Sequence, residues 1–183
     1  FFLSPAVAEL LTGSMPPSEF FSPIPFALVV ALYGSGAVLA REITLRWHKG
    51  WPTLLTLGAA YGIVEEGLMV KSFFDPAWPD LGTLGVYGRW AGVNWVWSVE
   101  LTLFHAVFSI GIPVLLVTLI FRDRQGDSWV SASCLRGLGG ILAADVLLGF
   151  VALTPYRPPV LPCALAALLA AGLVWIARRM PMS

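Results

Sequence analysis

Runs of about twenty apolar residues recur along this chain, separated only by short connections rich in glycine, proline and charge. A run of that length is what a helix needs to cross the hydrocarbon core of a bilayer, which is about 30 Å thick. The composition agrees, since 57% of the 183 residues are hydrophobic, only 12% are charged and the mean hydropathy is +0.80. A soluble globular domain has roughly 25% charged residues. The sequence therefore predicts an all-α, polytopic membrane helical bundle.

We expect one transmembrane domain over residues 1–183, with about six helices, the first of them partial. The expected spans are 1–11, 25–46, 51–73, 94–121, 135–153 and 159–176. The connections HKGWP, RDRQGDS and TPYRPP hold the glycine, proline and charged residues that end helices. No soluble domain is expected between the spans.

Basic residues indicate the orientation of the bundle, because Lys and Arg in short connections stay on the cytoplasmic side. They gather at ends that the predicted topology places together: Arg46, Lys49, Arg122, Arg124, Arg136, Arg178 and Arg179. We therefore expect a multi-pass protein with both termini in the cytoplasm.

Residues 75–93 form a long aromatic loop on the opposite, non-cytoplasmic side. Its Trp78, Tyr87 and Trp90, together with Trp95 and Trp97, are typical of the aromatic belt at a membrane interface. The alternative is a lid or re-entrant cap over a site.

The stretch YGIVEEGLMVK places two adjacent carboxylates, Glu65 and Glu66, inside an apolar span. At 1.5 Å of rise per residue they lie roughly 11 Å below the non-cytoplasmic surface, and His105 on the next span lies roughly 16 Å below it. Glu9 falls in the same layer, and Asp145 lies near the middle of the fifth span. An ionisable group at the bilayer centre costs about 2.5–3.5 kcal/mol, so these groups are expected to share a polar cavity.

Helical spacing predicts which residues of the fourth span face this cavity. Residues three or four apart share a helix face, so the following residues form a largely polar stripe: Asn94, Ser98, Leu101, His105 and Ser109. Glu100 lies five residues before His105 and is expected to point elsewhere, about 140° away.

The candidate catalytic residues are Glu65, Glu66, His105 and Asp145. Two adjacent carboxyls in a low-dielectric site cannot both ionise cheaply, so one is expected to hold a proton while the other acts as a base. The imidazole could orient a water or stabilise an oxyanion.

A structural alternative stands beside this catalytic interpretation. Lys71 or Arg41 could pair with the glutamates and fix the packing of the helices. For Arg41 itself, the sequence favours extension to the cytoplasmic interface over an ion pair with Glu42.

Other patterns limit the function further. The formal net charge is zero, which gives no attraction for nucleic acid. Cys134 and Cys163 lie in separate apolar segments without metal-ligand spacing, so no metal site is predicted. The sequence has no P-loop, dinucleotide fingerprint or CxxC pattern. The cofactor stays unknown, because His105 could also be an axial ligand of a haem or a chlorin.

The EE pair followed by a basic residue, with a His one helix later, resembles the CAAX-protease and bacteriocin-processing superfamily of intramembrane glutamic proteases. Its motifs are EExxxR, FxxxH and HxxxN or HxxxD. Glu65, Glu66 and His105 match the first two, and Asp145 could end the third. Val70 stands in place of the motif Arg, Leu101 in place of Phe and Ile141 in place of His. The resemblance implies that Glu65 or Glu66 activates a water and that His105 assists at the oxyanion.

More generally, SPAVAELL, YGSGAVLARE, GWPTLL and HAVFS are similar to stretches of uncharacterised bacterial integral membrane proteins, which implies a bacterial inner membrane. Three function classes follow: a protease-like intramembrane hydrolase, a non-catalytic subunit of a larger membrane complex that binds partner chains or a cofactor, and a small proton-coupled carrier component. The hydrolase is preferred narrowly, and the lipid bilayer is the one partner that every class shares.

Overall fold

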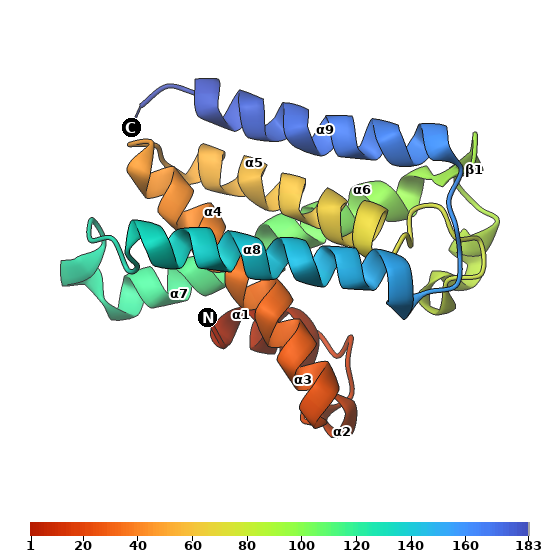
Figure 1. The fold of residues 1–183 in the computed structure, drawn as a ribbon, viewed down its shortest axis with the longest axis horizontal. Helices are drawn as coiled ribbons and strands as arrows, with labels where there is room; N and C mark the ends of the chain where they lie inside the picture. The colour runs from red at the N-terminus through yellow and green to blue at the C-terminus, as the bar shows by residue number, and fades with distance from the viewer. Residues whose placement is uncertain (183) are drawn as a thin grey trace.

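The computed structural model describes residues 1–182, most of which lie in helices that run alongside one another (Figure 1). The helices are α1 (Leu3–Pro5), α2 (Pro17–Phe20), α3 (Pro23–Val29), α4 (Ser35–Arg46), α5 (Trp51–Gly62), α6 (Trp95–Phe104), α7 (Ile112–Ile120), α8 (Ala132–Leu148) and α9 (Val160–Arg179). Five π-helical segments continue them: η1 (Ala6–Leu11), η2 (Val30–Gly34), η3 (Ile63–Met69), η5 (His105–Gly111) and η7 (Gly149–Leu153).

Two 3-10 segments and a small hairpin complete the described chain. The 3-10 segments are η4 (Pro79–Gly85) and η6 (Arg122–Arg124). Strands β1 (Arg89–Trp90) and β2 (Val93–Asn94) pair antiparallel within the predicted aromatic loop. The all-α expectation therefore holds for the bundle, and the hairpin is the single exception among residues 1–182.

Four continuous helices are long and apolar enough to cross a membrane: Pro23–Arg46, Trp95–Ile120, Ala132–Leu153 and Val160–Arg179. They lie close to four of the predicted spans. A fifth rod, formed by α5 and η3, packs against α9, α4 and η5 inside the bundle. It is not among the candidate spans, because Glu65 and Glu66 lower its hydropathy. The first predicted span forms only the short α1 and η1, so the count of about six is not confirmed.

Side-chain caps define where two of these helices begin. The Asn94 side chain accepts a hydrogen bond from Trp97 N at 3.0 Å, and the Ser131 hydroxyl accepts one from Cys134 N at 3.2 Å. Each satisfies a backbone N–H that has no partner within its helix. The predicted start at residue 135 is therefore three residues too late, since α8 begins directly after Ser131.

A proline in the fourth helix fixes the N-terminal segment. Pro113 has no backbone N–H, so it cannot donate to the carbonyl of Ser109, four residues earlier. The buried Ser4 hydroxyl donates to this carbonyl at 2.6 Å. This hydrogen bond joins α1 to η5 one turn before the proline.

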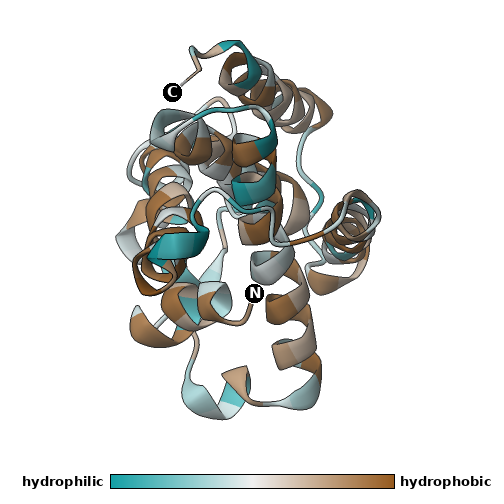
Figure 2. Cartoon of the chain, turned by 90° about the vertical axis from the view of Figure 1, so that its left-hand side faces the viewer, coloured by the Kyte–Doolittle hydropathy of each residue, from teal (hydrophilic) through white to brown (hydrophobic). Residues whose placement is uncertain are grey.

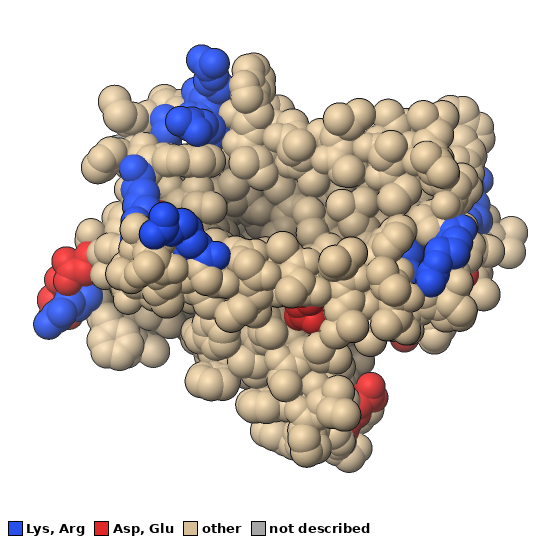
Figure 3. Space-filling model, in the orientation of Figure 1, with Lys and Arg blue, Asp and Glu red and all other residues tan. Residues whose placement is uncertain are grey.

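The connections with the predicted cytoplasmic residues meet at one end of the bundle. Arg46 donates to Val130 O at 2.7 Å, which joins the end of α4 to the connection before α8. Lys49 donates to Met180 O, and the Arg178 guanidinium lies 5.7 Å from the Trp47 ring, so the chain's last helix ends here too. Figure 2 looks onto this end, where hydrophilic turns face the viewer, and Figure 3 shows its Lys and Arg side chains in blue at the left.

Arg41 does not extend to the interface as predicted. It is 6% exposed and donates to Glu42 Oε1 at 2.6 Å and to Gln125 O at 2.8 Å. Its guanidinium also lies 4.1 Å from the centre of the Trp129 ring. A hydrogen-bonded partner and an aromatic face compensate the burial of the charge, so the predicted extension was wrong.

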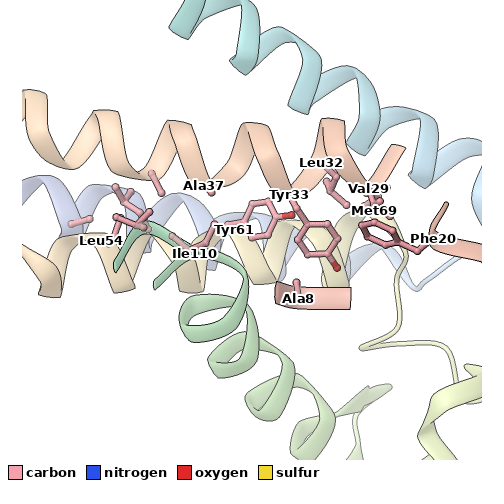
Figure 4. Packing of buried hydrophobic residues seen from close by; sticks show 14 residues of the cluster. Ala8, Phe20, Val29, Leu32, Tyr33, Ala37, Leu54, Tyr61, Met69 and Ile110 are labelled. Carbon is pink, nitrogen blue, oxygen red and sulfur yellow. The ribbon is translucent and has the colours of Figure 1, made fainter. Parts of the chain in front are cut away.

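The core of the bundle contains two tyrosines, Tyr33 and Tyr61, whose ring centroids are 6.2 Å apart (Figure 4). Gly36 leaves the space for one of them, because a Cβ there would lie 2.3 Å from the Tyr61 ring. Overpacking of this kind typically costs about 1–3 kcal/mol. We expect Gly36→Val to lower the free energy of unfolding by about that amount, measured by SDS titration in mixed micelles. Gly140→Ala on α8 is the control, since nothing lies within 4 Å of a Cβ there. Equal stability of the two variants would contradict the packing argument.

Candidate functional site

Four of the five π-helical segments meet at one polar cluster. Glu9 lies on η1, Tyr33 on η2, Glu65 and Glu66 on η3, and His105 with Ser109 on η5. A π-helical turn adds a residue to the winding of an α-helix, and such turns occur frequently at functional sites. Here the altered winding accompanies the convergence of two adjacent glutamates on one imidazole.

The imidazole of His105 lies between the two carboxyl groups. Its Nδ1 is 3.2 Å from Glu65 Oε2, and its Nε2 is 3.1 Å from Glu66 Oε1. Nδ1 is also 2.9 Å from the Ser109 hydroxyl. All three ionisable side chains are buried, with His105 only 1% exposed. The predicted convergence of Glu65, Glu66 and His105 is present in the structure.

A chain of hydrogen bonds holds one glutamate in place. Trp97 Nε1 donates to the Ser72 hydroxyl at 3.0 Å, and the Ser72 hydroxyl donates to Glu66 Oε2. Both oxygens of Glu66 therefore have partners. Glu65 differs, because its Oε2 has no hydrogen-bond partner among residues 1–182. The two adjacent carboxyls thus occupy distinct environments: Glu66 is hydrogen-bonded through both oxygens, whereas Glu65 Oε2 has only its 3.2 Å contact with His105 Nδ1.

Aromatic rings enclose the imidazole. The ring centroids of Tyr33 and Tyr61 are each 6.0 Å from that of His105, and the Phe104 centroid is 5.3 Å away. Gly62 allows the two helices to approach closely, since a Cβ there would lie 2.8 Å from His105 Cβ. The imidazole is thereby held in one orientation and separated from the surrounding lipid.

A cavity of about 690 Å³ opens beside the cluster. Glu65, Glu66 and His105 form part of its wall, and residues of η1, α2, α3, η2, α6, η7 and the aromatic loop also line it. Trp78 and Asp80 of that loop line the cavity, whereas Tyr87 and Trp90 are 70% and 73% exposed. The loop therefore divides: its first half covers the site and its second half faces outward.

The basic residues that could have neutralised the glutamates are engaged elsewhere. Lys71 Nζ donates to Phe150 O at 2.7 Å and to Thr154 O at 3.3 Å, at the end of the α8–η7 helix. Cations are favoured at a helix C-terminus, where carbonyls lack helical partners. Arg41 binds Glu42, as described above. The structural alternative, in which Lys71 or Arg41 pairs with the site glutamates, is therefore wrong.

The structure does not bring Asp145 into this cluster. Asp145 is 5% exposed on α8, both its oxygens lack hydrogen-bond partners among residues 1–182, and it does not line the cavity. Glu100 is exposed, as the helical spacing predicted. The polar stripe is present in part: Leu101 and His105 line the cavity, and Ser109 contacts the imidazole.

Sequence reasoning did not identify several residues of the site. Ser72 and Tyr33 were not predicted to belong to it, and neither were Glu19 and Asp80, which line the cavity. Tyr33 was missed because a tyrosine inside an apolar span is only weak evidence for a functional site. No sequence pattern indicated Ser72, because its contact with Glu66 depends on the turn after η3, where Lys71 has a φ of +65°.

The three ionisable residues could hold a metal ion. Each of Glu65, Glu66 and His105 offers one ligand atom, and these atoms lie within 4.8 Å of one another. Two carboxylates and an imidazole are the ligand types of catalytic zinc sites, which leave one position open for water. No metal site was predicted from the sequence, because the spacing of the cysteines was considered and these three residues were assigned to acid–base chemistry.

Helices long enough to span a membrane, packed around buried carboxyl and imidazole groups, define a polytopic membrane protein. The chain matches, over residues 1–183, a family described as an uncharacterized membrane protein family, and it belongs to that family. No curated protein and no solved structure matches it.

Proposed function

We propose that the protein is an intramembrane hydrolase in which Glu65, Glu66 and His105 activate a water molecule. The observation that carries this proposal is the position of Glu65 in the wall of a cavity: its Oε2 lies 3.2 Å from His105 Nδ1 and accepts no hydrogen bond within residues 1–182. A general base must reach the proton that it removes directly or through one water. A water between Glu65 and a bound substrate fits that requirement.

The reaction follows from these positions. Glu65 removes a proton from the water, and the water oxygen forms a bond to the carbonyl carbon of an amide or ester. His105, oriented by Glu66 and Ser109, lies 3.2 Å from Glu65 Oε2 and holds this base in place during the attack. The bond from the carbonyl carbon to the leaving group then breaks, and the leaving group takes the proton that Glu65 holds. The buried site strengthens each electrostatic interaction relative to water.

The resemblance to the CAAX-protease and bacteriocin-processing superfamily supports this chemistry at Glu65, Glu66 and His105. It does not extend to the third motif, since Asp145 lies outside the cluster and Ile141 stands where a His is expected. We therefore propose a glutamate–histidine hydrolase without a second histidine, in which Ser109 and Glu66 orient the imidazole.

The charge distribution supports an orientation with the arginine-rich end of the bundle in the cytoplasm of a bacterial inner membrane. The turn after α4, the connection before α8 and the end of α9 meet there, joined by contacts of Arg46, Lys49 and Arg178. Basic residues in short connections stay cytoplasmic. The cavity then lies toward the non-cytoplasmic side.

Incorporation of heavy oxygen tests the proposal across two broad classes of substrate. Purified protein in liposomes is incubated in H₂¹⁸O with a library of transmembrane-length peptides and with membrane lipids, and the products are analysed by mass spectrometry. Hydrolysis leaves one ¹⁸O in each new carboxyl group. We expect labelled products from the wild type. Labelled products in neither pool would reject the hydrolase and favour a non-catalytic subunit or a carrier component.

Zinc should inhibit this activity. Three ligand atoms within 4.8 Å of one another can close around Zn²⁺, which binds nitrogen and oxygen ligands at about 2.0–2.2 Å. Occupancy would remove Glu65 as the base. We expect micromolar Zn²⁺ to abolish ¹⁸O incorporation and EDTA to restore it, with full activity in EDTA alone. Loss of activity in EDTA that added metal restores would instead define a metal-dependent hydrolase.

A further inference from the structure

The cavity beside the cluster is lined by acidic groups and by no Lys or Arg. Its acidic residues are Glu9, Glu19, Glu65, Glu66 and Asp80. Two lie at the floor beside His105, and Glu19 and Asp80 are exposed at the wall. Glu19 and Asp80 are exposed carboxylates and no Lys or Arg lines the cavity, so the wall carries negative charge that the described lining does not balance.

The basic residues at the cavity's end of the bundle do not neutralise its carboxylates. Lys71, Arg89 and Arg157 stand at the same end of the bundle, and each donates to main-chain carbonyls. Lys71 binds Phe150 O and Thr154 O, Arg89 binds Phe74 O and Gly92 O, and Arg157 binds Val151 O, Thr154 O and Tyr156 O. No salt bridge joins any of them to a carboxylate within residues 1–182.

An independent observation points to a ligand. Glu65 is 4% exposed and lines the cavity, and its Oε2, which lies 3.2 Å from His105 Nδ1, accepts no hydrogen bond among the described residues. A buried polar atom without a partner is costly, at about 1–3 kcal/mol. A donor that enters the cavity from outside the chain would satisfy it.

The remaining wall is apolar. Its side chains come from α3, η2 and α6 and include Leu28, Val29, Leu32, Trp97, Leu101 and Phe104. A cavity of about 690 Å³ is far larger than an ion and lies within the usual range for organic ligands. The lining therefore complements a ligand that carries positive charge on an otherwise apolar body.

We propose that the cavity binds a positively charged, partly apolar peptide segment, with Lys or Arg side chains held by Glu9, Glu19 and Asp80. This inference rests on the proposed function, because it names the substrate of the same site. The apolar residues of the segment contact α3 and α6, a backbone N–H of the segment donates to Glu65 Oε2, and the neighbouring carbonyl carbon lies within reach of the water that Glu65 activates. Charge at the wall selects the peptide, and the cluster at the floor cleaves it.

Peptide binding tests the proposal. Three fluorescent, leucine-rich peptides that differ only at two positions, occupied by Lys, norleucine or Glu, are titrated against the protein in phosphatidylcholine nanodiscs. Fluorescence anisotropy reports the Kd. We expect the Lys peptide to bind at least about tenfold more tightly than the norleucine peptide, and this preference to weaken as salt is added. Equal affinity of the Lys and norleucine peptides would overturn the inference.

A double variant assigns the preference to the cavity wall. Glu19→Gln with Asp80→Asn should remove most of the preference for Lys, because both carboxyls line the cavity. Asp123→Asn with Asp127→Asn is the matched control, since it changes the charge equally near η6, at the opposite end. Unchanged selectivity in the first variant would also overturn the inference.

The same peptides separate this inference from the hydrolase proposal. Charge-selective binding without ¹⁸O incorporation would reject the hydrolase and keep the cationic ligand. Hydrolysis of all three peptides at equal rates would keep the hydrolase and reject the cationic specificity.

Discussion

Replacement of Glu65 by Gln is expected to reduce ¹⁸O incorporation by about 10³-fold, because general-base catalysis contributes about 10²–10⁴-fold. Glutamine has the size of glutamate but cannot accept the proton of the attacking water. Glu66→Gln should lose less, about 10–10²-fold, because its amide can still contact His105 and Ser72 while holding the imidazole less firmly. The adjacent carboxyls are thus predicted to differ, with Glu65 as the base and Glu66, hydrogen-bonded through both oxygens, as the positioning residue.

Glu100→Gln is the control for both variants. Glu100 lies on α6 outside the cavity lining, and it is exposed, so its replacement should leave the rate unchanged. Thermal unfolding in detergent checks that each variant is folded. A larger loss in Glu66→Gln than in Glu65→Gln would reverse the assignment of the two roles, and full activity in both would reject the cluster as the catalytic centre.

Glu42→Ala should lower the free energy of unfolding by about 3–5 kcal/mol, the range for removal of one partner of a buried ion pair. Glu42 is fully buried, and four groups donate to it: Arg41 at 2.6 Å, Ser128 at 2.6 Å, Trp129 N at 2.8 Å and Arg46 at 3.3 Å. Removal leaves the buried Arg41 charge without a carboxylate and frees the connection before α8. SDS titration in mixed micelles measures the change.

The control for this prediction is Asp127→Ala. Asp127 is an exposed carboxylate whose contact with Arg124 is 3.8 Å, with both side chains more than half exposed. Such a pair contributes about 0–1 kcal/mol. If Glu42→Ala were as stable as Asp127→Ala, the arginine–glutamate cluster would not be what joins α4 to the connection before α8.

Hydrophobic run length and helix-ending residues were enough to predict the positions of the long helices. The candidate spans 23–46, 95–120, 132–153 and 160–179 each lie within a few residues of a predicted one. Depth estimated from helical rise was also enough to bring Glu65, Glu66 and His105 together, because helix length fixes the height of a side chain in a bundle. The rule that buried charges share a cavity then identified the site.

The direction in which each side chain points around its helix axis, and the π-helical turns, were not predictable from the sequence in the same way. Asp145 has a suitable depth, but its place on α8 lies outside the cavity lining. The partners of Arg41 depend on where the connection before α8 folds back onto α4, which no local pattern encodes. The choice of Lys71 for the carbonyls at the end of η7, rather than for the glutamates, depends on a long-range contact of the same kind.

The π-helical segments bear on how such a site can arise or disappear. A π-helical turn behaves as a one-residue insertion in an α-helix. Deletion of a single residue from Ile63–Met69 would restore α-helical winding, so the flanking turns would keep their direction while side chains within the segment would move to new positions around the axis. The rod could still lie in the bundle, with a carboxyl turned away from His105. Loss of a single residue would then remove the proposed catalytic cluster without removing the bundle. Close relatives of similar length and hydropathy therefore need not share an activity.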